Sequence, residues 1–128
     1  MNFIDIVAML AVVQYLYFGG LVGQARGRYG VSAPAVAGHP QFERIYRVQM
    51  NTQELLVALI PALYAAARYW PSQYVAGLGA VYLVGRLFYW RAYVDGRRRG
   101  LGFNLSIFPV FILALAALVP AVLGKGVA

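Results

Sequence analysis

Residues 104–123 read NLSIFPVFILALAALVPAVL, and none of these side chains is charged. A helix of about 20 apolar residues is about 30 Å long, which matches the hydrocarbon thickness of a bilayer. Pro109 and Pro120 are the interruptions in this stretch. The stretch therefore predicts a membrane-spanning helix over residues 104–123.

The composition of the whole chain agrees with this prediction. The 128 residues are 62% hydrophobic and 12% charged, whereas a soluble domain is about half apolar and about a quarter charged. A chain of this length has room for about four spans with short connections, and none for a separate soluble domain. We therefore predict an all-α fold, an integral membrane four-helix bundle occupying residues 1–128 as one domain, with helices over about residues 3–22, 42–68, 73–94 and 104–123.

The net charge of +7 is concentrated in two of the predicted connections. Basic residues hold loops on the cytoplasmic side of a membrane and contact lipid headgroups there, which explains the excess without nucleic acid as a partner. We expect the first and third connections in the cytoplasm and both termini on the opposite side, where Arg68 and Lys125 are the basic residues. The two connections carry Arg26, Arg28, Arg97, Arg98 and Arg99.

The chain has no cysteine and a single histidine, His39. Catalysis by a protein thiolate, disulfides and cysteine-based metal sites are therefore excluded. One histidine is also too few for an ordinary zinc site. We predict no metal site.

Two polar stripes interrupt the apolar sequence. At about 100° per residue, an i, i+3, i+7, i+10 spacing keeps four side chains on one face of the second helix. These residues are Arg44, Arg47, Asn51 and Glu54. The third helix repeats the i, i+3, i+7 spacing with Arg86, Tyr89 and Tyr93, and Tyr82 lies close to the same face.

Charged side chains that face hydrocarbon cost at least about 2.5 kcal/mol each, so we expect the stripes to face each other or water. Glu54 could simply neutralise Arg86 or Arg47. However, one carboxylate cannot neutralise Arg44, Arg47 and Arg86 together with the adjacent Arg26. The surplus positive charge predicts an anionic ligand whose carboxylates accept bonds from the arginines, while an ammonium on the same ligand pairs with Glu54. A zwitterionic peptide or amino-acid-like molecule fits this description.

A motif in the second helix adds a resemblance. Residues 42–54 read FERIYRVQMNTQE, residues 23–26 read GQAR, and residues 84–86 read VGR and are followed by Tyr89 and Tyr93. This pattern closely resembles the signature of the MAPEG family, the membrane-associated proteins in eicosanoid and glutathione metabolism. The likeness in length, number of spans and polar stripes extends over essentially the whole chain.

The resemblance implies a homotrimer of four-helix subunits that binds glutathione, as co-substrate, between adjacent subunits near the cytoplasmic face. Glutathione carries two carboxylates and an ammonium. By the resemblance, Glu54 receives the ammonium, and Arg47 and Arg26 hold carboxylates. The positions that match family glutathione contacts are Arg26, Arg47, Asn51, Glu54, Tyr89 and Tyr93, and Arg44 and Arg86 match the recurring basic positions of the motifs.

In catalytic members of this family, an arginine activates the glutathione thiol as a thiolate, because a nearby positive charge lowers the pKa of a thiol. The thiolate then attacks a lipophilic small-molecule electrophile that enters from the bilayer. This chain departs from the leukotriene-synthesising member, since Gly27 stands where that member has a basic residue. The arginine that precedes the fourth helix there has its counterpart only in the cluster 97–99. The candidates for the activating arginine are Arg26, Arg28 and Arg99.

Three functions are consistent with these features. The first is a glutathione transferase with peroxidase-like activity on lipophilic electrophiles. The second is a non-catalytic glutathione- or lipid-binding scaffold similar to the lipoxygenase-activating branch of the same family, which the set Arg47, Asn51 and Glu54 disfavours. The third is a small four-helix exporter that uses Glu54 for proton exchange, which the neighbouring arginines disfavour because they would repel a cationic drug.

Overall fold

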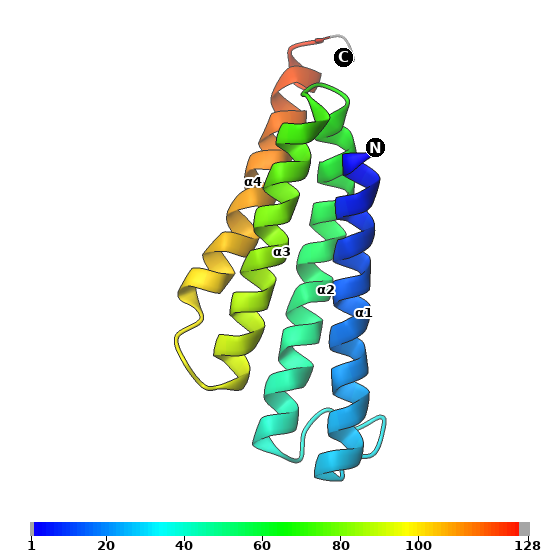
Figure 1. The fold of residues 1–128 in the computed structure, drawn as a ribbon, viewed down its shortest axis with the longest axis vertical. Coiled ribbons are helices and arrows are strands. Elements are labelled where there is room, and N and C mark those ends of the chain that lie inside the picture. The colour runs from blue at the N-terminus through cyan, green and yellow to red at the C-terminus, as the bar shows by residue number, and fades with distance from the viewer. Residues whose placement is uncertain (1, 126–128) are drawn as a thin grey trace.

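The computed structural model describes residues 2–125. In this part of the chain the regular elements are helices, with no strand: α1 (Phe3–Tyr29), α2 (Pro40–Ala67), α3 (Ser72–Val94) and α4 (Gly100–Val122). The four helices run along the long axis of the molecule (Figure 1). The predicted all-α, four-helix architecture is confirmed.

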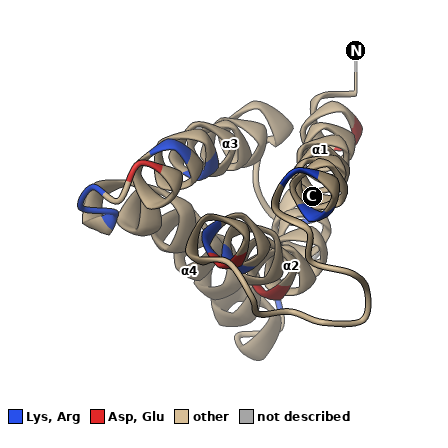
Figure 2. Ribbon diagram, turned by 90° about the horizontal axis from the view of Figure 1, so that it is seen from below, with Lys and Arg blue, Asp and Glu red and all other residues tan. Residues whose placement is uncertain are grey.

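The two ends of the bundle carry different residues. Both termini and the turn between α2 and α3 lie at one end, and the α1–α2 and α3–α4 connections lie at the other (Figure 1). Figure 2 views the molecule from this second end and shows basic residues, coloured blue, on several helices. We call it the basic end, and it contains Arg26, Arg28 and residues 97–99.

Helix α1 is longer than predicted. The prediction ended this helix at about residue 22 and put Arg26 and Arg28 in a loop, whereas α1 continues to Tyr29. The helix ends where Gly30 adopts a left-handed φ of 69° and donates its backbone N–H to the carbonyl of Arg26. Glycine in this conformation is a common helix C-cap. Glycines earlier in the stretch weaken a helix by only about 1 kcal/mol each, so they do not stop it.

Two other helix starts also differ from the prediction. Helix α2 begins at Pro40, and the side chain of His39 caps it by accepting a bond from the backbone N–H of Gln41. Proline is favoured in the first turn of a helix because its missing N–H is not needed there. Helix α4 begins at Gly100 instead of residue 104.

Helices α2 and α3 form the centre of the bundle. Each of them packs against the other three helices, whereas α1 does not pack against α4 within the described residues. The largest buried cluster draws side chains from all four helices, including Ala8, Leu59, Leu63, Tyr82 and Leu113. The polar stripe on α2 therefore lies where neighbouring helices can reach it.

The crossing of α3 and α4 depends on two glycines. A Cβ atom added to Gly85 would lie 2.7 Å from the backbone carbonyl carbon of Leu105. A Cβ atom added to Gly102 would collide with the backbone of Tyr89. Glycine is required at both positions because only a residue without a side chain lets the two backbones approach this closely.

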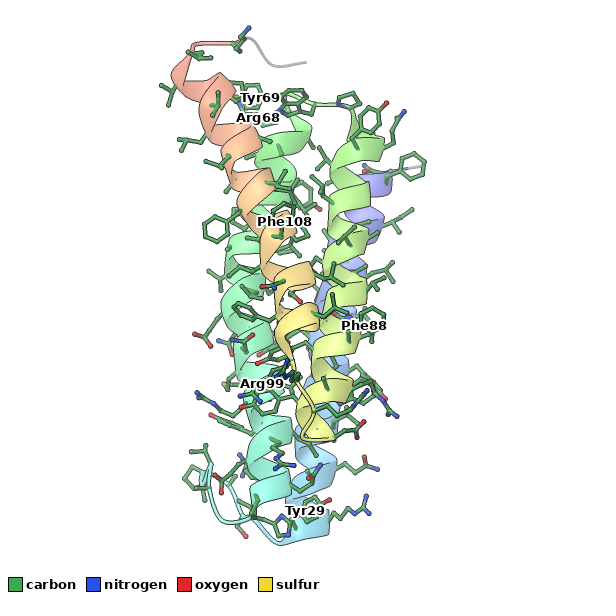
Figure 3. All side chains as sticks on the ribbon, turned by 90° about the vertical axis from the view of Figure 1, so that its left-hand side faces the viewer. Tyr29, Arg68, Tyr69, Phe88, Arg99 and Phe108 are labelled. Carbon is green, nitrogen blue, oxygen red and sulfur yellow. The ribbon has the colours of Figure 1, made fainter. Side chains whose placement is uncertain are left out.

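The outer faces of α1 and α4 are apolar and exposed. By length and composition, these are the two helices of the described chain that could cross a membrane. Leu16 on α1 and Phe108 and Phe111 on α4 are more than half exposed, and Figure 3 shows Phe88 and Phe108 projecting outward from α3 and α4. The outward-facing surface of both helices is thus suited to contact with lipid.

Candidate functional site

A cavity lies on α2 near the basic end. Its volume is about 430 Å³, and it is lined by Val36, Pro40, Glu43, Arg44, Tyr46, Arg47 and Tyr93. Successive turns of α2 supply most of these side chains, while α3 contributes Tyr93. The structure thus brings together three residues of the predicted stripes, Arg44, Arg47 and Tyr93. We call this the arginine cavity.

Arg99 lies beside the arginine cavity. The carbon at the centre of its guanidinium is 4.3 Å from the centre of the Tyr93 ring, within the range of a cation–π interaction. Figure 3 shows Arg99 just before α4, on the α3–α4 connection. The guanidinium of Arg44 reaches the same connection, because its Nη1 lies 3.2 Å from the position of a Cβ atom added to Gly96. Two arginines therefore line the cavity, and a third contacts the tyrosine in its wall.

The arginine cavity has an excess of positive charge. Among residues 2–125, a single ion pair is present, and it joins Arg97 to Asp95 on the surface at 3.2 Å. Glu43 is the carboxylate in the cavity wall, and it accepts a hydrogen bond from the backbone N–H of Gly38 at 3.2 Å. One carboxylate faces two lining arginines and the adjacent Arg99, so the cavity is suited to an anionic ligand.

Arg86 lies in the interior of the bundle and does not line the arginine cavity. The side chain is fully buried. Its Nε donates to Ser106 Oγ at 2.9 Å, and its Nη1 donates to Asn51 Oδ1 at 3.0 Å and to Thr52 Oγ1 at 3.1 Å. Its guanidinium also lies 4.2 Å from the centre of the Tyr89 ring. Neutral oxygens and a ring surround this charge because the bundle interior offers no carboxylate near it.

The remaining residues of the two stripes are partly separated. Asn51 is half-buried and bonded to Arg86, and Tyr89 is buried with its ring 5.5 Å from that of Tyr93. The stripes therefore meet at Asn51 and Arg86, as predicted. Glu54 is exposed, lies outside the arginine cavity and forms no ion pair with any described residue. The alternative that it neutralises Arg86 or Arg47 is not found in the structure.

Arg26 and Arg28 do not line the arginine cavity of their own chain. Arg26 Nη1 donates to the carbonyls of Ala35 at 2.7 Å and Val31 at 3.3 Å, which fastens the α1–α2 loop to the end of α1. Arg28 lines a separate cavity of about 170 Å³ together with Trp90. Within one chain, neither of these two candidates lines the cavity that Arg44, Arg47 and Tyr93 form.

The model of the MAPEG family matches residues 4–119 of this sequence. The chain belongs to the MAPEG family. It is 41% identical to an uncharacterised protein of the cyanobacterium Synechocystis over 88% of this chain and 83% of that protein. It is 39% identical to human microsomal glutathione S-transferase 2, over 85% of this chain and 75% of that protein. Bovine leukotriene C4 synthase is 36% identical over 74% of this chain and 63% of that protein.

Family membership confirms the resemblance seen in residues 42–54. However, two buried polar residues of this MAPEG chain were not predicted from the sequence. Thr52 and Ser106 are both fully buried and both accept hydrogen bonds from Arg86. Thr52 is next to Asn51, and Ser106 is a hydroxyl residue in the apolar stretch that predicts the fourth helix. The hydroxyl side chain at each position was the signal that could have predicted these contacts, because a buried hydroxyl group needs a hydrogen-bond partner.

Glu43 was also missed as a cavity residue. It precedes Arg44 in the motif and lies outside the spacing of the polar stripe. Its place follows from the α1–α2 loop, which folds back so that Gly38 bonds to it and Val36 lines the same cavity. Spacing along a helix does not predict how a loop returns to that helix.

Proposed function

We propose that this MAPEG protein is a membrane-embedded glutathione transferase with peroxidase-like activity. Glutathione binds along α2 at the arginine cavity, and its thiol reacts with lipophilic electrophiles that enter from the bilayer. The observation that carries the proposal is the arrangement of Arg44, Arg47 and Tyr93 around one cavity, with Arg99 next to it. Carboxylates are the natural partners of such arginines, and glutathione has two.

The length of the polar stripe fits a tripeptide. Arg47 and Glu54 are seven residues apart on α2, which corresponds to about 10 Å along the helix axis. A fully extended chain of three residues also reaches about 10 Å. With one carboxylate at Arg44 and Arg47, the ligand's ammonium would arrive near the exposed Glu54. Asn51 lies between these two ends and offers an amide to the middle of the ligand.

A positive charge close to the thiol supplies the chemistry. A cation near a thiol lowers its pKa and raises the fraction of the reactive thiolate. The contact of Arg99 with Tyr93 in the cavity wall supports Arg99 as the activating arginine within one chain. In a homotrimer, Arg26 and Arg28 of a neighbouring copy would complete the site, because both lie at the basic end and neither lines the cavity of its own chain.

Turnover by the purified wild-type protein tests this proposal. We expect detergent-solubilised protein to conjugate glutathione to a chromogenic aryl halide at a rate that rises with the glutathione concentration and saturates. The control is the same reaction with cysteine in place of glutathione, because cysteine has the thiol but lacks the length to bridge Arg47 and Glu54. Glutathione binding without turnover across several electrophiles would instead favour a non-catalytic glutathione-binding scaffold. An absence of glutathione binding would reject the transferase and leave the lipid-binding scaffold.

A further inference from the structure

We infer that Arg86 is a positioning residue of the glutathione site, which holds Asn51 and Tyr89 in place without touching the ligand. The inference rests on the proposed function and deepens it. It differs from the expectation drawn from charge, in which Arg86 is one of the arginines that bind the carboxylates of the ligand. The burial of Arg86 and its bonding partners carry the inference.

Arg86 links three helices inside the bundle. From α3, its Nε–H reaches Ser106 on α4, and one of its terminal nitrogens reaches both Asn51 and Thr52 on α2. The side chain has no exposed surface, so a ligand in the arginine cavity cannot contact it in this arrangement. A guanidinium presents its donors in a rigid planar fork and so fixes the direction of each bond, whereas the three donors of a lysine ammonium rotate freely.

The buried charge is costly, and the cost indicates a role beyond packing. A buried ion without a partner of opposite charge loses several kcal/mol of hydration, and well-packed apolar residues are often as stable or more stable. All three oxygens bonded to Arg86 are neutral, and its Nη2 has no partner among the described residues. An arginine here therefore fixes the orientation of its neighbours at the expense of stability.

The effect on Asn51 follows from donor and acceptor chemistry. A guanidinium can only donate hydrogen bonds, so the amide of Asn51 must turn its oxygen toward Arg86. The NH₂ group of the same amide is then left as a donor on the α2 stripe between Arg47 and Glu54. A peptide carbonyl of glutathione is the partner that such a donor would bind. Without Arg86, the amide could rotate and present its oxygen to that carbonyl instead.

The effect on Tyr89 follows from stacking. The central carbon of the Arg86 guanidinium lies 4.2 Å from the centre of the Tyr89 ring, and the centre of the Tyr93 ring lies 5.5 Å from the same point. Tyr93 in turn lines the arginine cavity and lies under Arg99. A chain of contacts therefore runs from the buried Arg86 through Tyr89 to the cavity wall.

Two variants separate positioning from stability. We expect Arg86→Gln to raise the Kd for glutathione about tenfold, as the loss of oriented bonds to a charged or polar ligand would. Leu63→Ala removes a fully buried apolar side chain outside the hydrogen-bond network of Arg86, so it should lower Tm in detergent while the Kd for glutathione stays within about twofold. In an Asn51→Leu background, Arg86→Gln should change the Kd much less, because the group it orients is gone.

An unchanged Kd in folded Arg86→Gln protein would overturn the inference, as would fully additive effects with Asn51→Leu. Should Arg86→Gln fail to fold, nitrogen-15 labelling of the arginine side chains in the wild-type protein decides. The Arg86 Nε–H should exchange slowly with water, and glutathione should shift the Arg47 signal far more than the Arg86 signal. An Arg86 signal that shifts as much as that of Arg47 would make Arg86 a ligand contact. The proposed function fails separately, if wild-type protein does not bind glutathione at all.

Discussion

Replacing Arg47 by alanine is expected to weaken glutathione binding by about 30-fold to 150-fold, the effect of about 2 to 3 kcal/mol that a hydrogen bond to a charged group contributes. Arg47 lines the arginine cavity from α2 and has no carboxylate partner among the described residues. Its guanidinium is therefore free to bind a ligand carboxylate. Isothermal titration of the purified variant with glutathione measures the loss directly.

Arg68→Ala is the matched control for Arg47→Ala. Arg68 is the residue at which α2 ends, and its side chain is exposed. Figure 3 shows it toward the opposite end of the molecule from Arg99. Its replacement removes the same charge and should leave the Kd for glutathione within about twofold, because screening by salt makes distant surface charges weak. Equal losses in both variants would mean that general charge, and not the arginine cavity, controls binding.

Replacing Gly102 by alanine is expected to destabilise the bundle by about 3 kcal/mol, at the upper end of the usual cost of overpacking. The new methyl group would collide with the backbone of Tyr89, which cannot move aside as a flexible side chain could. Helix α4 must then move away from α3, which also disturbs the contact of Tyr89 with Tyr93. Thermal unfolding in detergent should show a lower Tm, and glutathione binding should weaken in parallel.

Gly100→Ala makes the same chemical change two residues earlier. Nothing lies within 4 Å of the position of its new Cβ atom. Alanine in place of glycine at a compatible helical site commonly stabilises a protein by about 0.4 to 1 kcal/mol. We therefore expect an unchanged or slightly higher Tm for Gly100→Ala, and a similar fall in Tm for both variants would argue against a close crossing of α3 and α4 at Gly102.

The helical architecture could be predicted because charged residues are scarce in this sequence. Because a polar side chain is costly in lipid, each one in an apolar chain excludes one face of its helix from contact with lipid. The spacing of Arg44 and Arg47 on one helix and the place of Tyr93 on the next predicted that they would meet, and the structure brings them to one cavity. The orientation across the membrane and the assembly into trimers stay predictions.

The depth of each side chain could not be predicted in the same way. Spacing assigns Arg86 and Tyr93 to one stripe, but the structure buries the first and leaves the second at the cavity wall. The difference arises from Ser106 on α4 and from Gly102, which brings α4 close to α3. The periodicity of one helix does not predict which residues of a neighbouring helix it will contact.

The contacts of Arg26 and Arg28 could not be predicted from the sequence either. Both are basic residues near the predicted site, yet Arg26 bonds to the carbonyl of Ala35 and Arg28 lines another cavity. Because α1 continues as a helix through both residues, their side chains point in different directions.

Calorimetric titration of the wild-type protein with glutathione and with its dimethyl ester tests the central claim most directly. The ester keeps the thiol, the ammonium and the peptide backbone of the ligand, adds one methyl group at each carboxylate and removes both negative charges. If the arginine cavity recognises carboxylates, glutathione should bind at least about tenfold more tightly than the ester, and the difference should shrink in Arg47→Ala. Equal affinity for the two ligands in the wild-type protein would contradict the assignment of this cavity as a glutathione site.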